Sequence, residues 1–147
     1  MRVLLPEGAK ASADPILEIL KNYKTIAVVG LSSNRGRPSH GVAEYMKSTG
    51  YRIIPVNPNE KEVLGEKSYA RLEDVREKIE IVDIFRRAEE VPAAVDSAIR
   101  VGAKVVWMQL GIANAGAAEK ARAAGLIVVE DACIYVEHKK RVRLLMG

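Results

Sequence analysis

Residues 25–39 constrain the fold more than any other part of the chain, and they read Thr-Ile-Ala-Val-Val-Gly-Leu-Ser-Ser-Asn-Arg-Gly-Arg-Pro-Ser. The apolar run at 26–29 is typical of a parallel strand that is buried on both faces. A small polar loop follows from Gly30, and a helical pattern follows the loop. A strand, a short loop and a helix in this order aim free backbone N–H groups at an anion. Because Arg35 and Arg37 lie in the loop, the segment predicts a site for a phosphate-bearing ligand.

The rest of the chain continues this alternation of apolar runs and helical patterns. Strands are expected at residues 25–31, 52–56, 79–85, 105–110 and 126–129. Strands this apolar need cover on both faces, and right-handed crossovers then give a doubly wound α/β domain with helices on both faces. We predict a five-stranded parallel sheet with the order 3-2-1-4-5, numbered along the chain. The ligand crevice is then expected at the carboxyl ends of strands 1 and 4, where the strand order reverses.

Length and composition indicate one domain over residues 1–147. Residues 1–13 are expected to form a loosely ordered leader, and residues 134–147 a basic C-terminal helix. A single Cys excludes an intramolecular disulfide, and no apolar run approaches the roughly 20 residues of a membrane span. We therefore expect a cytoplasmic protein that does not enter a membrane.

The charge balance suits an anionic small molecule. The net charge is +4 and the pI is near 9.2, but the basic residues are not interleaved with aromatic residues in a stacking pattern. Nucleic acid is therefore not expected as a partner. Two His and one Cys are also too few for a tetrahedral His/Cys metal site without carboxylates, so no metal is expected.

The usual ligand of a doubly wound fold is a nicotinamide or flavin dinucleotide, and two features argue against it here. The loop Gly30-Leu-Ser-Ser-Asn-Arg-Gly36 is not G-x-G-x-x-G, and no Gly-Lys-Ser/Thr follows it. The second strand ends in Val56-Asn57-Pro58, without an acidic residue to accept a hydrogen bond from a ribose hydroxyl. An NAD(P)-dependent oxidoreductase domain remains the first alternative.

A set of short motifs identifies a second type of ligand. In chain order they are Val-Val-Gly-Leu-Ser (28–32), Arg-Pro-Ser-His (37–40), Gly-Tyr-Arg-Ile-Ile-Pro-Val-Asn-Pro (50–58), Leu-Gly-Glu-Lys-Ser-Tyr (64–69), Val-Asp-Ile-Phe-Arg-Arg (82–87), Val-Trp-Met-Gln-Leu-Gly (106–111) and Glu-Asp-Ala-Cys (130–133). Over about residues 15–141 the chain resembles the small stand-alone CoA-binding proteins, which are similar to the CoA-binding domain of the succinyl-CoA synthetase alpha subunit. The resemblance implies a Rossmann-like fold with coenzyme A or acyl-CoA as ligand.

By this resemblance, the first loop would bind the phosphates. The pyrophosphate would be received by the backbone and hydroxyl donors of Gly30, Ser32 and Ser33, and the phosphates would pair with Arg35 and Arg37. Further donors on the same side would be Ser39 and His40. The family commonly has a smaller alanine where Leu31 stands, so Leu31 could narrow the loop.

The resemblance assigns the remaining site residues to the other strand ends. The adenine and ribose would be bordered by Val56, Asn57 and Pro58. The adenosine and 3′-phosphate would be shaped by Phe85, Arg86 and Arg87, and Gln109 would lie near the pantetheine arm. Cys133 has two interpretations, a small buried core residue, which we favour, or a thiol that forms a mixed disulfide with CoA.

No sequence pattern indicates catalytic residues, so binding CoA as a carrier, sensor or regulatory module is the expected activity. Whether the chain is also an enzyme is left open. A second alternative is a nucleotide-binding subunit that serves a larger acyl-CoA ligase in trans. A protein partner or a homodimer is compatible with either function.

Overall fold

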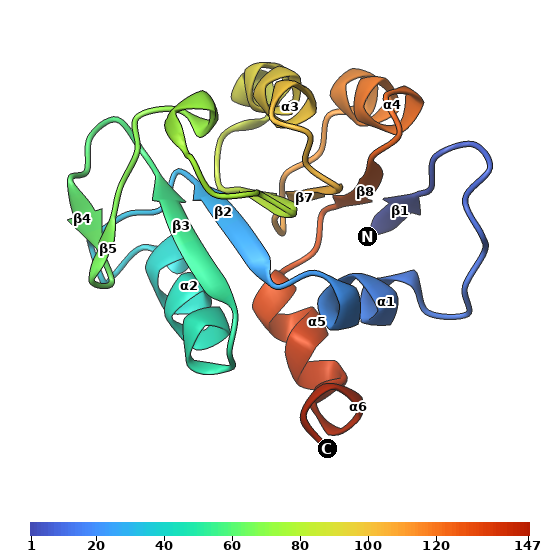
Figure 1. The fold of residues 1–147 in the computed structure, drawn as a ribbon, viewed down its shortest axis with the longest axis horizontal. Coiled ribbons are helices and arrows are strands. Elements are labelled where there is room, and N and C mark those ends of the chain that lie inside the picture. The colour runs from blue at the N-terminus through green and yellow to red at the C-terminus, as the bar shows by residue number, and fades with distance from the viewer.

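A six-stranded sheet lies at the centre of the structure, a computed structural model that describes residues 1–147 (Figure 1). The strand order is β1-β8-β7-β6-β2-β3, and every pair is parallel except β1 with β8. These strands are β1 (Arg2–Leu4), β2 (Thr25–Val29), β3 (Arg52–Val56), β6 (Ile81–Ile84), β7 (Val105–Met108) and β8 (Ile127–Glu130). A separate hairpin joins β4 (Glu62–Val63) to β5 (Glu66–Lys67).

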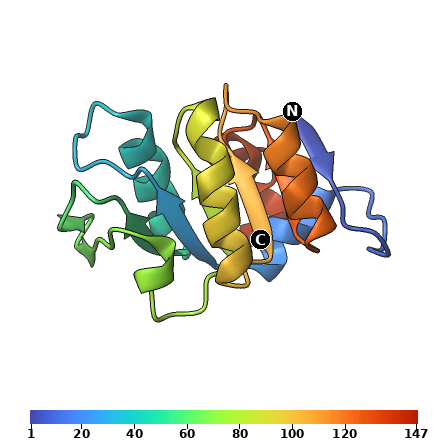
Figure 2. The same cartoon turned by 90° about the horizontal axis from the view of Figure 1, so that it is seen from above.

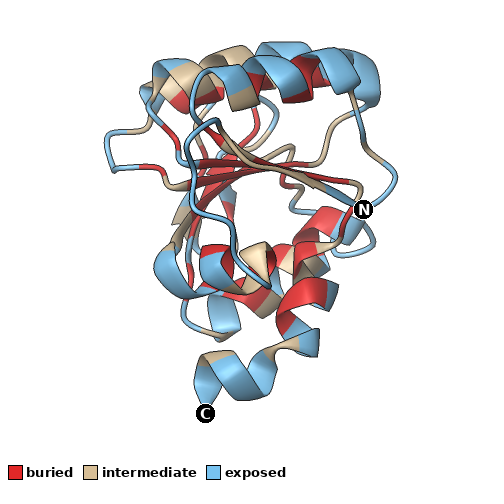
Figure 3. Cartoon of the chain, turned by 90° about the vertical axis from the view of Figure 1, so that its right-hand side faces the viewer, coloured by how far each residue is buried: buried red, intermediate tan, exposed pale blue.

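Helices cover both faces of the sheet, as the apolar strands require. They are α1 (Pro15–Asn22), α2 (Pro38–Ser48), α3 (Val91–Arg100), α4 (Ala115–Ala123), α5 (Ile134–Lys140) and α6 (Val142–Met146), with short 3-10 turns at Leu72–Asp74 and Ala88–Glu90. One core packs α3 and α4 on one face, and a second packs α1, α2 and α5 on the other. Figures 1 and 3 show the buried sheet between these two layers.

The apolar strands contribute to both cores because their side chains alternate between the faces of the sheet. In β2, Ile26 and Val28 face the α1, α2 and α5 side, whereas Ala27 faces α3 and α4. Trp107 of β7 is fully buried and its Nε1 donates to the Ala132 carbonyl at 2.8 Å. The doubly wound α/β architecture predicted from the sequence is therefore confirmed.

The predicted strand order was wrong, and the correction moves the crevice. Numbered as in the prediction, the parallel strands lie in the order 2-1-3-4-5, so β2 has β3 on one side and β6 on the other. The strand order therefore reverses between β2 and β6, not between strands 1 and 4. At such a point the two crossovers leave in opposite directions and the strand ends form a crevice. Figure 2 shows this spread, with α2 and α3 on opposite sides of β2.

The two ends of the chain also differ from the prediction. Part of the expected leader forms β1, which adds an antiparallel edge strand through the pairing of Val3 with Val129. The expected C-terminal helix is interrupted at Arg141 into α5 and α6. Arg141 lies between the two helices. Its guanidinium donates to both carboxylate oxygens of Asp14 at 2.8 and 3.0 Å. Asp14 also caps α1 by accepting the Leu17 N–H, so one side chain connects both ends of the domain.

None of the helices is both long enough and apolar enough to span a membrane.

Candidate functional site

A cavity of about 930 Å³ opens where β2, β6 and β7 end. Its lining comes from the loop after β2, the start of α2, the turn after β3, and the segments that follow β6, β7 and β8. These segments meet because the carboxyl ends of parallel strands lie on one edge of the sheet. The predicted site residues that line the cavity are Gly30, Ser32, Arg37, Ser39, Asn57, Phe85, Arg86, Arg87, Gln109 and Cys133.

The other predicted residues lie outside the lining. Leu31 and Val56 are buried in the two cores, and His40 is buried in the first turn of α2. The side chains of Ser33, Arg35 and Pro58 are exposed to solvent. The structure therefore places ten of the predicted residues around the cavity and leaves these six outside its lining.

Gly30 is fixed by packing against the end of β6. Its φ is +90°, and a Cβ at this position would lie 2.4 Å from the Phe85 carbonyl oxygen. Its N–H donates to the Val56 carbonyl at 2.8 Å, so it is not free to bind the pyrophosphate as the resemblance implied. Gly30 instead allows three strand ends to approach one another, and it places the Arg86 side chain over the loop, with Nε 3.3 Å from the same Cβ position.

The loop after Gly30 is held by its own polar side chains. The Ser32 N–H donates to Ser39 Oγ at 3.1 Å, Asn34 N–H donates to Ser32 Oγ at 3.0 Å, and Gly36 N–H donates to Asn34 Oδ1 at 2.8 Å. The N–H groups of Leu31, Arg35 and Ser39 make no hydrogen bond within the protein. Free backbone donors between a strand and a helix are the groups that bind phosphate oxygens in this fold.

Asn57 connects the loop to the neighbouring strand ends and is buried. Its Nδ2 donates to the Leu31 carbonyl at 3.0 Å, and its Oδ1 accepts the Asn59 N–H at 3.0 Å. Its own N–H donates to the Tyr69 carbonyl, and its carbonyl accepts from Ser68 Oγ. Because these groups are all used inside the protein, Asn57 positions the walls of the cavity.

The positive charge of the cavity comes from three arginines. Arg87 pairs with Glu89 and Glu90 at 3.5 and 3.4 Å, whereas Arg37 and Arg86 form no salt bridge. Unpaired guanidinium groups beside free N–H donors attract a phosphate, because the planar guanidinium matches phosphate geometry. These two arginines are therefore the strongest anion-binding groups in the cavity.

Gln109, which follows β7, and Cys133, which follows β8, form one wall of the cavity. Gln109 is buried, and its Oε1 accepts the N–H of Ile134 at 3.1 Å, which caps α5. Cys133 is half-buried at the N-cap of α5 and its side chain makes no capping bond. Its thiol therefore lines the cavity rather than being enclosed in the core, contrary to the interpretation we favoured from the sequence.

His138 lies away from the cavity. It is buried in the last turn of α5, and its Nδ1 lies 2.8 Å from the hydroxyl of Tyr45 on α2. Burial lowers the pKa of His138 below its usual value, with a smaller contribution from Lys24. Through its contact with Tyr45 the ring joins α5 to α2.

Sequence reasoning missed several residues of the lining. They are Pro38 and Val42 of α2, Asn59 and Glu60 of the turn after β3, Ala88 after β6, and Ile112 after β7, whereas Leu110 and Gly111 were expected at the crevice and do line it. Leu110 is 70% exposed, and this exposure follows from its place in the loop beyond β7. The sequence did contain a signal for these residues, because each of their segments follows a predicted strand and so lies at the carboxyl edge of the sheet.

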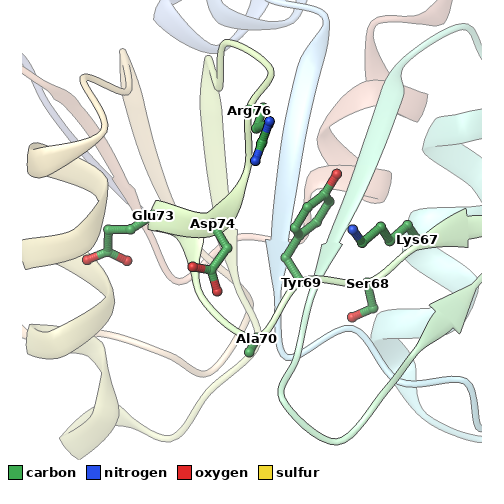
Figure 4. Close-up of a pocket in the computed structure, with 7 residues that line it drawn as sticks. All are labelled: Lys67, Ser68, Tyr69, Ala70, Glu73, Asp74 and Arg76. Atoms are coloured by element: carbon green, nitrogen blue, oxygen red, sulfur yellow. The ribbon is translucent and has the colours of Figure 1, made fainter.

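A second hollow, of about 600 Å³, lies beside the edge of the sheet and is lined by Lys67, Ser68, Tyr69, Ala70, Glu73, Asp74 and Arg76 (Figure 4). Its two carboxylates are already paired, Glu73 with Arg100 at 2.9 Å and Asp74 with Arg71 at 3.2 Å. None of the predicted site residues lines this hollow. The cavity at the ends of β2 and β6 therefore remains the candidate site.

Comparison with known proteins agrees with this geometry. The family model described as "CoA binding domain" matches residues 24–139, which include every strand that borders the cavity. The chain belongs to this CoA-binding domain family.

Two of the proteins that this chain resembles are matched over most of their length. The uncharacterized protein YneT of Bacillus subtilis is 42% identical over 123 residues, which cover 84% of this chain and 91% of YneT. A solved structure, a hypothetical protein from Pyrococcus horikoshii, is 43% identical, covers 90% of each chain and superimposes with a TM-score of 0.84. The similarity to both proteins therefore extends over most of this chain and most of theirs.

The domain also resembles part of larger enzymes. The ADP-forming acetate–CoA ligase II of Archaeoglobus fulgidus is 30% identical over 92 residues, which cover 61% of this chain and 14% of the ligase. The match is thus to a short portion of that enzyme.

Proposed function

We propose that this domain binds coenzyme A or acyl-CoA in the cavity between the ends of β2 and β6. The observation that carries the proposal is the pair of unpaired guanidinium groups, Arg37 and Arg86, beside a loop with free N–H donors. CoA carries about four negative charges at neutral pH, mostly on its pyrophosphate and 3′-phosphate. A member of a CoA-binding domain family with this cavity has the groups that such a ligand needs.

The lining suggests how the ligand would lie. The pyrophosphate would take the N–H group of Ser39, which is free and belongs to a residue of the lining, with Arg37 as the cation of the preceding loop. The 3′-phosphate would be bound by Arg86 or Arg87 at the end of β6. The pantetheine arm would run along the apolar side chains after β7 toward Gln109 and Cys133. The domain would then act as a carrier, sensor or regulatory module.

One observation keeps the dinucleotide alternative in view. The sequence offered no acidic residue at the end of the second predicted strand, but the turn after β3 places the Glu60 carboxylate in the cavity. In dinucleotide-binding proteins an acid near this position accepts hydrogen bonds from a ribose hydroxyl. The Glu60 carboxylate already accepts the Ser33 N–H at 2.7 Å, which argues against that role.

A comparison of ligands separates the two functions. A ligand that binds only the native state raises the melting temperature, and at equal concentrations the tighter ligand raises it more. We expect CoA to raise it more than dephospho-CoA, because the 3′-phosphate finds an arginine, and we expect NAD and NADP to have little effect. Stabilisation by NAD without stabilisation by CoA would support the oxidoreductase instead. Co-purification with the remaining part of an acyl-CoA ligase would favour the subunit alternative.

A further inference from the structure

The Glu60 carboxylate occupies a donor of the phosphate-binding loop. Its Oε2 accepts the Ser33 N–H at 2.7 Å, a length typical of a charge-assisted hydrogen bond. Ser33 follows β2 and Glu60 follows β3, so the contact joins two loops at the edge of the cavity, which Glu60 lines. It is the only hydrogen bond or salt bridge of the carboxylate in the structure.

The turn after β3 holds Glu60 in this place. The Glu60 N–H donates to the Asn57 carbonyl at 3.2 Å, and the Asn59 N–H donates to Asn57 Oδ1 at 3.0 Å. This is the turn that an Asn side chain forms with its own following backbone. Since Asn57 Nδ2 also binds the Leu31 carbonyl, the turn and the phosphate-binding loop are connected twice, once through Asn57 and once through Glu60.

The carboxylate conflicts electrically with an anionic ligand. Glu60 shares the cavity with Arg37 and Arg86 but forms no salt bridge with either. A phosphate bound to the loop and to these arginines would come close to an uncompensated negative charge. At short range in a partly enclosed site, such repulsion is large enough to change affinity several-fold.

We infer that Glu60 fills one anion position of the loop when no ligand is bound, and that a ligand phosphate must displace it. This inference rests on the proposed function. Glu60 would then determine specificity, because it opposes weakly held anions and yields to a ligand whose other contacts compensate for its displacement. The electrostatic repulsion between Glu60 and the ligand grows with the number of ligand phosphates near the loop. Glu60 therefore determines how strongly the affinity depends on the charge of the ligand.

The test replaces the charge and keeps the shape. Glu60→Gln retains an oxygen that can accept the Ser33 N–H, while Glu62→Gln makes the same change in net charge at an exposed residue of β4 outside the cavity. Calorimetric titrations of CoA, dephospho-CoA and pantetheine into the wild type and both variants form a series of falling ligand charge. Thermal melts confirm that each variant is folded.

We expect Glu60→Gln to bind CoA about three- to ten-fold more tightly than the wild type does, with a smaller gain for dephospho-CoA and none for pantetheine. Glu62→Gln should stay within about twofold of the wild type for all three ligands. Unchanged or weaker CoA binding by Glu60→Gln, or an equal gain for pantetheine, would overturn the inference and leave the proposed function standing. CoA binding by Glu60→Gln alone would support the inference, whereas failure of both proteins to bind CoA would overturn the proposed function and with it the inference.

Discussion

Gly30 and Phe85 approach so closely that a methyl group on Gly30 would lie 2.4 Å from the Phe85 carbonyl oxygen. This contact joins the ends of β2 and β6, the two strands between which the order of the sheet reverses. The cavity is therefore built on a backbone contact that permits no side chain. Two of its cations, Arg37 and Arg86, come from the segments that follow these strands.

The first prediction concerns Gly30→Ala. The substitution adds a clash with backbone and a residue at φ +90°, so we expect the free energy of unfolding to fall by about 1–3 kcal/mol. Urea denaturation measures this free energy of unfolding. Gly41→Ala is the control, because Gly41 lies in α2 with open space around it, and alanine there should stabilise the helix by up to about 1 kcal/mol. Equal stabilities for the two variants would contradict the role assigned to Gly30.

The second prediction concerns the unpaired arginines. Arg37→Ala and Arg86→Ala should each weaken CoA binding by about 1.5–3 kcal/mol, the scale of a charge-assisted hydrogen bond. Arg35→Ala should have a smaller effect, because the Arg35 side chain is exposed and does not line the cavity. Arg76→Ala, in the second hollow, is the control for net charge. If Arg76→Ala weakened binding as much as Arg37→Ala, the arginines would act through net charge rather than through contact.

The third prediction concerns Asp83, which is fully buried in β6 and has one carboxyl oxygen without a hydrogen-bond partner. Burial raises the pKa of Asp83 well above its usual value, so the folded protein holds a proton that the unfolded chain releases above about pH 4. Stability should therefore fall as pH rises above that value, by up to about 1.4 kcal/mol per pH unit, until Asp83 itself ionises. Asp83→Asn should remove this slope between pH 5 and 8. Parallel stability curves for the wild type and Asp83→Asn would show that Asp83 does not titrate in this way.

The fourth prediction concerns Arg141, whose guanidinium binds Asp14 and the buried carboxylate of Glu137. Arg141→Met leaves Glu137 with Lys140 at 3.5 Å as its remaining cation, so we expect a loss of about 1–3 kcal/mol in the free energy of unfolding. Arg141 also lowers the pKa of Asp14 by hydrogen bonding, which adds stability above the ordinary pKa of an Asp that is lost as pH falls. The variant should therefore lose less stability on acidification than the wild type. Arg143→Met, at an exposed residue without an ion pair, should change neither quantity.

The fold class could be predicted from the sequence, but the order of the strands could not. Consecutive apolar residues such as those at 26–29 and 81–84 show that a strand is covered on both faces, and this cover gives the layers. The same residues carry no information on which neighbour a strand pairs with, because strands pair through backbone N–H and C=O groups that every strand offers alike. β6 lies beside β2 although the chain reaches it from β3 through a long connection that contains β4 and β5.

The candidate site was predicted where residues directly follow strands and missed where a turn carries a residue back. Arg37 and Arg86 lie in loops that leave β2 and β6, so the fold alone brings them to one edge. Glu60 reaches the cavity through the hydrogen bonds of Asn57, which no periodicity reports. Likewise, the sequence does not show that the Gly30 N–H is used inside the protein, because its acceptor, the Val56 carbonyl, belongs to another strand.

Calorimetric titration of CoA into the purified protein tests the central claim most directly. The account predicts saturable binding of one CoA per chain, weakened in Arg37→Ala and Arg86→Ala and unchanged in Arg76→Ala. Absence of CoA binding to the wild type would contradict the account, and so would unchanged binding to a variant that lacks both Arg37 and Arg86.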